Sequence, residues 1–211
     1  MAEAYLTVGE QAAAEFVESR SRFIGTICPV TTEAQALDFI AAMKKQYWDA
    51  RHNVYAYVLR DERISRSTDD GEPQGTAGAP VLEVLQKRGL TDCVIVVTRY
   101  FGGILLGTGG LVRAYSKSAA LAVESAGILE RRLCSVGEVS CDYAAYGRVQ
   151  PLVADFGGVL DDTVFEDTVT LRFHIPRERE GTFQKQLTEI SAGQLTFCKK
   201  NENFFDFPEK K

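Results

Sequence analysis

The stretch RYFGGILLGTGGLVR, at positions 99–113, joins an apolar run at 93–98 to a segment at 111–125 with helical spacing of apolar residues. A short apolar run of this kind is typical of a buried strand, so the stretch predicts a strand, a loop and a helix in succession. Glycine permits backbone angles and close approaches that other residues resist, and five glycines lie in the stretch: Gly102, Gly103, Gly107, Gly109 and Gly110. Free N–H groups and the helix dipole make such a helix start favourable for an anion.

The charge around this stretch is locally positive. No acidic residue occurs between positions 93 and 123, whereas Arg99, Arg113 and Lys117 do, in a chain whose net charge is −5. Arg113 and Lys117 are four residues apart, which places them on one face of the predicted helix. Cations near a helix N-terminus oppose its dipole, and a bound anion would relieve that. The pattern predicts a site for an anion or a nucleic-acid backbone; the alternative is a tight packing loop whose arginines pair with carboxylates of the same chain.

The spacing of the glycines excludes two common nucleotide motifs. Gly102 and Gly107 have the interval of a phosphate-binding P-loop, but Thr108 follows where that motif requires lysine. Gly107 and Gly109 lack the third glycine of a dinucleotide fingerprint.

An acidic turn precedes the stretch. Asp69, Asp70 and Glu72 are clustered around Gly71 and before Pro73. Hard oxygen ligands suit Mg²⁺, and paired carboxylates suit acid–base chemistry, so both functions are open. The third interpretation is structural, in which the turn pairs with Arg99 or Arg113 and caps the helix that follows.

Two further residues are candidates for the same site. His52 precedes a predicted strand and can act as a base or stack on a ligand, or be a satisfied structural residue. Thr76 can contact a phosphate.

The chain as a whole predicts an α+β protein of two domains, 1–130 and 131–211. The first part alternates strands and helices, with a polar irregular segment at 66–78 before a helix at 79–88. From position 132 the pattern becomes βαββαβ, the split βαβ order of ferredoxin-like domains. Its predicted elements are strands at 133–143, 159–165, 167–175 and 195–199 and helices at 144–156 and 177–192, followed by a loose tail at 201–211.

Composition limits the class of protein. The five cysteines are scattered without a C-x-x-C pair, which favours reduced thiols and a cytoplasmic location. Two histidines argue against a His-rich zinc site. No apolar segment is long enough to span a membrane, and the chain has neither a strongly charged half nor a polybasic tail. We expect no cofactor, no membrane partner and no sequence-specific DNA recognition.

Two long motifs resemble the IMPACT family, which includes the bacterial YigZ-like proteins. They are TDDGEPQGTAGAP at 68–80 and VTRYFGGILLGTGGLVRAY at 97–115, and the block HNVYAY at 52–57 resembles the family's preceding segment. The resemblance implies an N-terminal domain similar to domain 2 of ribosomal protein S5 and a ferredoxin-like C-terminal domain similar to domain V of EF-G. It also implies a role associated with translation, as in the eukaryotic relatives.

The leading hypothesis is therefore a non-catalytic, translation-associated protein. It would bind RNA, the ribosome or another phosphate-bearing or translation-related partner through the basic glycine-rich loop. GHMP kinases share the first fold, which keeps open an Mg²⁺-dependent enzyme acting on a phosphorylated small molecule or nucleotide. A protein–protein adaptor that uses the sheet of the second domain is the third possibility.

Overall fold

The computed structural model describes residues 3–60 and 64–208. The chain forms two compact units, one built from residues 5–130 and the other mainly from residues 131–207. Both units combine helices with a sheet, which confirms the mixed α/β, two-region architecture. Within the described ranges, no helix has the length and apolar character needed to cross a membrane.

The first unit contains a five-stranded antiparallel sheet whose central strand is the predicted buried run. The strand order is β2-β3-β6-β4-β5, and β6 is buried along all but its last residue. The strands are β2 (Ala12–Glu18), β3 (Ser21–Pro29), β6 (Cys93–Tyr100), β4 (His52–Leu59) and β5 (Ile64–Thr68).

Strand β5 corrects one expectation. The segment from position 66 was predicted to be irregular because it is polar, but residues up to Thr68 pair with β4 at the edge of the sheet. An edge strand hydrogen-bonds on one side only and tolerates polar residues, so its pattern does not resemble that of a core strand.

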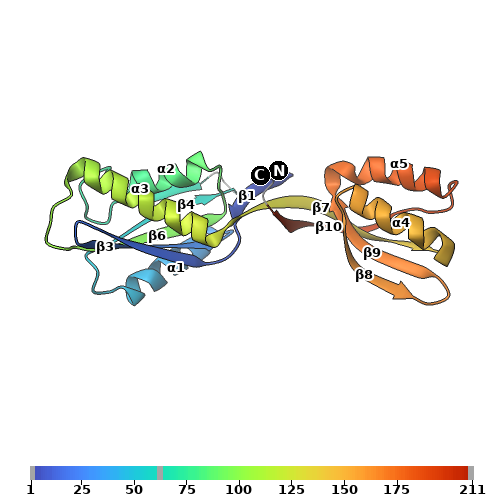
Figure 1. Ribbon diagram of the computed structural model, residues 1–211, viewed down its shortest axis with the longest axis horizontal. Coiled ribbons are helices and arrows are strands. Elements are labelled where there is room, and N and C mark those ends of the chain that lie inside the picture. Colours follow the sequence, from blue (N-terminus) through green and yellow to red (C-terminus); the bar gives the residue numbers. More distant parts are fainter. Residues whose placement is uncertain (1–2, 61–63, 209–211) are drawn as a thin grey trace. The chain divides into compact units, whose positions relative to one another are not determined.

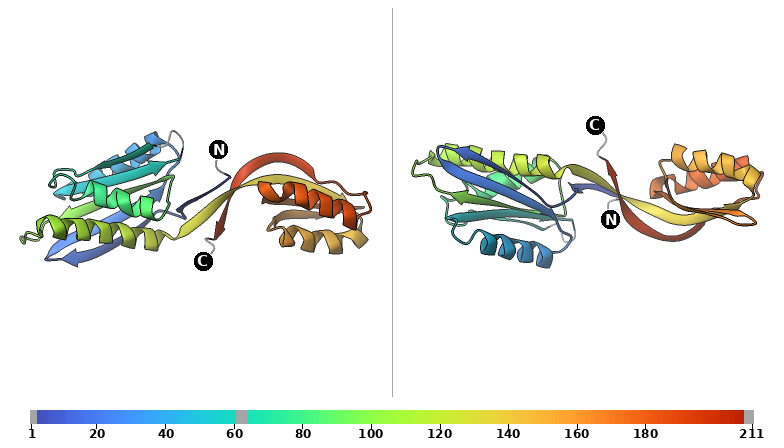
Figure 2. Two further views of the ribbon diagram at one scale, coloured as in Figure 1. Left: turned by 90° about the horizontal axis from the view of Figure 1, so that it is seen from above. Right: turned by 60° about the horizontal axis from the view of Figure 1, so that its bottom comes forward.

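Helices cover both faces of this sheet. Helix α1 (Glu33–Gln46) packs on one face, and α2 (Gly78–Lys87) and α3 (Gly107–Ala126) pack on the other (Figures 1 and 2). Thr32 starts α1 with a reciprocal capping box formed with Gln35. The core beneath α2 and α3 includes Phe23 and Tyr115, both fully buried.

Helix α3 begins four residues earlier than its sequence predicts. Glycine disfavours helix, so the pattern placed the start at Leu111, whereas the structure places Gly107, Gly109 and Gly110 in the first turn. Burial of the apolar face of α3 against the sheet outweighs that weak propensity. Arg113 consequently lies beyond the first turn, where the dipole penalty assigned to it is small.

The second unit has the predicted βαββαβ order. Helices α4 (Tyr143–Asp155) and α5 (Glu180–Ile190) cover one face of its sheet (Figure 1). The sheet runs β1-β7-β9-β8, and β10 also pairs with β7. The strands are β7 (Ile128–Cys141), β8 (Val159–Phe165), β9 (Val169–Pro176) and β10 (Cys198–Pro208), and a 3₁₀ turn (Arg177–Arg179) precedes α5. Strand β1 (Ala4–Val8) belongs to the first unit in all but its first residue.

The C-terminal segment differs from its prediction. The last strand was placed at 195–199 and followed by a loose tail, but β10 extends from Cys198 to Pro208. Pairing with β7 explains why these residues form a strand, and the Phe205 ring also stacks on the His174 ring of β9 with centroids 3.7 Å apart. Positions 209–211 of the predicted tail lie outside the described residues.

Candidate functional site

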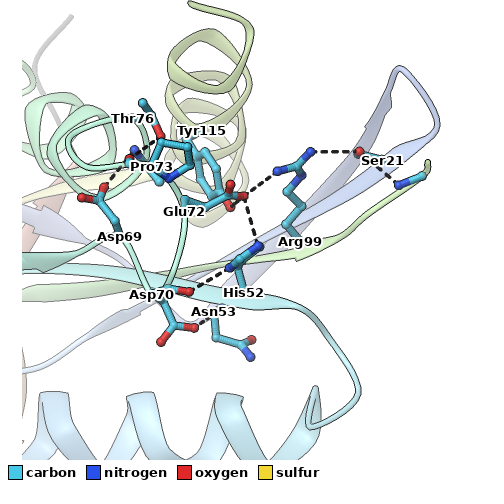
Figure 3. A network of polar contacts seen from close by, with 12 residues as sticks. Ser21, His52, Asn53, Asp69, Asp70, Glu72, Pro73, Thr76, Arg99 and Tyr115 are labelled. Carbon is cyan, nitrogen blue, oxygen red and sulfur yellow. Dashed lines mark hydrogen bonds and ion pairs between the residues drawn. The ribbon is translucent and has the colours of Figure 1, made fainter. Parts of the chain in front are cut away.

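A buried network joins the acidic turn to the glycine-rich stretch. Arg99 Nη1 donates to Glu72 Oε1 at 2.6 Å, and the Tyr115 hydroxyl donates to the same oxygen at 2.8 Å (Figure 3). The side chains of Glu72 and Arg99 are only 4% and 6% exposed. The acidic turn thus forms an ion pair with Arg99 through Glu72, as its interpretation as a structural element predicts.

Strand register places these groups together. Arg99 on β6 is the direct neighbour of Phe23 on β3 and of His52 on β4. The Arg99 guanidinium carbon lies 5.5 Å from the ring centroids of Phe23 and Phe101, and Nη2 donates to Ser21 Oγ at 3.4 Å. Arg99 is therefore committed to contacts inside the protein and presents little charge to a ligand.

Tyr115 was not singled out from the sequence. It lies on the apolar face of α3, where an aromatic residue is indistinguishable from core. Burial, followed by the negative charge of Glu72, raises the pKa of Tyr115 well above its usual range, so the phenol stays protonated and donates. The signal available was that a buried tyrosine hydroxyl needs a hydrogen-bond partner.

His52 is held in one orientation by the acidic turn. Its Nδ1 lies 2.8 Å from the Asp70 carbonyl oxygen, and because a carbonyl only accepts, Nδ1 carries the proton. The other ring nitrogen, Nε2, lies 3.8 Å from Glu72 Oε1. The Asp70 carboxylate accepts from Lys44 Nζ at 2.8 Å and from the Asn53 N–H at 2.7 Å.

Asp69 holds the N-terminus of α2. Its carboxylate accepts from the N–H groups of Gly75, Ala77 and Gly78 at 2.7–3.0 Å. Burial raises the pKa of Asp69, but these three donors together outweigh it and hold the pKa below its usual value. The three carboxylates of the acidic turn thus face three different sets of partners, and the described residues contain no group of three or more His, Cys, Asp or Glu placed to hold a metal ion.

Replacing Asp69 with alanine is expected to lower the free energy of unfolding by about 1–2 kcal/mol at neutral pH, as loss of a helix cap does. Because the folded pKa is depressed, this stabilisation is present above the unfolded pKa and is lost as the pH falls through the folded one. Urea denaturation of both proteins from pH 7 down to pH 3 measures the difference, which should shrink in acid. A pH-independent difference would contradict the proposed role of the carboxylate.

Two hollows open beside this network, and Leu105 and Leu106 line both of them. We call the first, of about 340 Å³, the basic hollow; Arg113 and Lys117 line it. We call the second, of about 390 Å³, the apolar hollow. The full lining of the basic hollow is Phe16, Glu18, Ser19, Leu105, Leu106, Gly110, Arg113, Ala114 and Lys117. That of the apolar hollow is Arg51, His52, Glu72, Pro73, Arg99, Phe101, Leu105, Leu106, Gly107, Thr108 and Leu111.

The sequence-predicted site residues therefore separate. Gly110, Arg113 and Lys117 line the basic hollow, whereas His52, Arg99 and Gly107 line the apolar one with Glu72. Four others, Thr76, Gly102, Gly103 and Gly109, are not among the described residues that line either hollow.

Local geometry explains most of those four. The Thr76 hydroxyl donates to the Pro73 carbonyl at 2.7 Å, Gly102 packs directly against the backbone at Arg20, and Gly103 has a positive φ of 82°. Arg51, Leu105 and Leu106 were not predicted as site residues. Arg51 stands outside the motifs, and leucines within the glycine-rich motif indicate packing rather than binding.

Comparison with known proteins identifies the family. The IMPACT family member YvyE of Bacillus subtilis is 40% identical over 211 residues, covering 96% of this chain and 97% of its own length. The chain belongs to the IMPACT family. The Impact N-terminal domain model matches residues 19–123, and a domain of unknown function, DUF1949, matches residues 139–194.

Two further relatives extend the likeness. The IMPACT family member YigZ of Escherichia coli is 32% identical over 179 residues, covering 83% of this chain and 88% of its own length. A solved structure described as a crystal structure of a hypothetical protein is 29% identical, with a TM-score of 0.61, and covers 96% of this chain and 100% of that one. Every residue that lines the apolar hollow of this IMPACT family chain falls within the Impact N-terminal domain match.

Proposed function

We propose that this IMPACT family protein binds RNA through the basic hollow, as a non-catalytic, translation-associated regulatory protein. The proposal rests on the exposure of Arg113 and Lys117 and on their lack of a carboxylate partner. Both are exposed on one face of α3, both line one hollow, and neither forms an ion pair with a carboxylate within the described ranges. Arg99, the third cation of the basic stretch, is neutralised by Glu72.

The local field supports a phosphate as the bound group. The first turn of α3 has no acidic residue and no side-chain cap. The partial positive charge of its N–H groups is therefore not offset by a side chain and can attract an anion. Gly110 brings this turn to the edge of the hollow that Arg113 and Lys117 line. Lys117 Nζ lies 4.5 Å from the Phe16 ring centroid, but neither cation has a carboxylate partner in the described ranges. Phosphates attract such cations without regard to sequence, which fits RNA-backbone binding.

The alternative enzyme that acts on a phosphorylated substrate with Mg²⁺ has less support. It requires carboxylates available to a cation, whereas Asp69, Asp70 and Glu72 accept hydrogen bonds from N–H groups, Lys44, Arg99 and Tyr115.

We also propose the finer fold assignment. The strand order β10-β7-β9-β8, with both helices on one face, supports a ferredoxin-like domain for residues 131–211. The strand, glycine stretch and helix from β6 to α3 support a domain similar to domain 2 of ribosomal protein S5 for residues 1–130.

The test is RNA binding by a charge-reversed protein. Replacing Arg113 and Lys117 together with glutamate is expected to weaken binding of a fluorescent single-stranded RNA at least about tenfold and to flatten its salt dependence. Fluorescence anisotropy over a salt series measures both quantities.

A matched control reverses two other exposed lysines, Lys45 on α1 and Lys185 on α5, with the same change in net charge. This control should bind RNA nearly as the parent protein does. Equal weakening in both variants would mean that net charge alone is responsible, and unchanged binding in the Arg113 and Lys117 variant would overturn the proposal.

A further inference from the structure

The apolar hollow and the basic hollow are adjacent, because Leu105 and Leu106 line both of them. Leu105 is 86% exposed and Phe101 is 42% exposed, although apolar side chains of this size gain by burial. Pro73 and Leu111 complete the apolar walls. A flat, largely apolar group that is covalently attached to a ligand in the basic hollow can cover these surfaces while the ligand stays bound there.

The Glu72 carboxylate in the apolar hollow has one oxygen that can accept a further hydrogen bond. Glu72 Oε1 accepts from Arg99 and from Tyr115, whereas Oε2 makes no hydrogen bond to any residue in the described ranges. The Glu72 side chain is 4% exposed and lines the hollow. A carboxylate oxygen is an acceptor only, so this position is suited to an N–H donor from a ligand. Arg99 balances its charge, which reduces repulsion of a phosphate nearby.

We propose that the apolar hollow receives one nucleobase of the RNA strand whose phosphates lie in the basic hollow, and that Glu72 accepts a hydrogen bond from the amino group of that base. This inference rests on the proposed function. Bases of single-stranded RNA are splayed out and recognised on their Watson–Crick edges. Apolar walls for the ring with a few polar groups for orientation are the usual composition of a small-ligand site, and in the apolar hollow the polar groups are Glu72, Arg51, His52, Arg99 and Thr108.

The chemistry of the contact predicts a preference between two bases of equal size. Cytosine presents an exocyclic amino group, a donor that carboxylates accept. Uracil has a carbonyl oxygen at that position, and its N3–H is flanked by two carbonyl oxygens that the Glu72 carboxylate would repel. We therefore expect cytosine to bind in the apolar hollow and uracil, a base of equal size, to bind there more weakly.

The experiment compares oligocytidine and oligouridine of equal length by fluorescence anisotropy on the full chain. Oligocytidine is expected to bind about tenfold more tightly, the value of one hydrogen bond to a charged group. The salt dependence of the two should be the same, because their phosphate contacts are the same.

Two variants localise the preference. In Glu72→Gln, the amide oxygen is expected to keep the Arg99 and Tyr115 bonds and leave the amide N–H₂ toward the base, so the cytosine preference should disappear. In Thr108→Trp, an exposed residue that lines the hollow becomes large enough to fill it. That variant does not alter the buried network, and it should bind both oligonucleotides equally, at the affinity of oligouridine. Thermal unfolding by circular dichroism checks that each variant folds.

The outcomes separate the two proposals. Binding of neither oligonucleotide to the parent protein overturns both. Binding that Arg113→Glu with Lys117→Glu abolishes, but with no difference between cytosine and uracil, overturns the base site and leaves the proposed function intact. A cytosine preference that survives Thr108→Trp also overturns the base site.

Discussion

Replacing Glu72 with alanine is expected to lower the free energy of unfolding of the unit formed by residues 5–130 by about 3–5 kcal/mol, the usual effect of removing one partner of a buried ion pair. The variant leaves the Arg99 guanidinium, 6% exposed, without its carboxylate. It also leaves the buried Tyr115 hydroxyl without an acceptor. Urea denaturation followed by far-ultraviolet circular dichroism measures the change in the transition of that unit.

The matched control is an ion pair at the surface. Glu83 and Lys87 lie 2.8 Å apart on α2, with side chains 58% and 72% exposed. Glu83→Ala is expected to change the free energy of unfolding by less than about 0.5 kcal/mol, because solvent and salt screen such pairs. A loss below about 1 kcal/mol in Glu72→Ala would mean that Arg99 finds water or another acceptor, and that the network is not essential to the fold.

Replacing Gly102 with alanine is expected to cost about 3 kcal/mol or more, the second large effect. An added Cβ at Gly102 would overlap the backbone carbonyl of Arg20 and lie 2.5 Å from the Ser21 nitrogen. Both obstacles are main chain at the turn between β2 and β3, so no side-chain rotation relieves the overlap. The Gly102 N–H also donates to Ser21 Oγ at 3.2 Å, and that bond would be strained as the strands move apart.

Gly109 provides the control within the same glycine-rich stretch. The nearest atom to an added Cβ there is Arg113 Nη1, at 3.6 Å, and the residue lies inside α3. Gly109→Ala is therefore expected to raise the free energy of unfolding by about 0.5–1 kcal/mol, the difference in helix propensity. Thermal and urea denaturation of both variants check the contrast. Similar losses at both positions would show that the contact with Arg20 is not what makes Gly102 sensitive to an added Cβ.

The sequence predicted most elements because their patterns are local. The run at 93–98, predicted as a buried strand, lies in β6, and the segment at 111–125, predicted as a helix, lies in α3. The errors have a shared origin in contacts that a local pattern does not contain. Pairing with β4 makes a strand of Ile64–Thr68, and packing against the sheet extends α3 back to Gly107.

The sequence by itself determined the family, through the two motifs at 68–80 and 97–115, and the local strand–glycine–helix order. It left open whether the acidic turn pairs with the basic stretch, holds Mg²⁺ or takes part in acid–base chemistry. Only the tertiary structure decided that Glu72 neutralises Arg99 and leaves Arg113 and Lys117 exposed. The physical reason is that the partners are distant in sequence: Arg99 is 27 residues from Glu72 and 78 from Ser21. Pairing of β3 with β6 places Ser21 near Arg99, and the turn that follows β5 carries Glu72 to the same guanidinium.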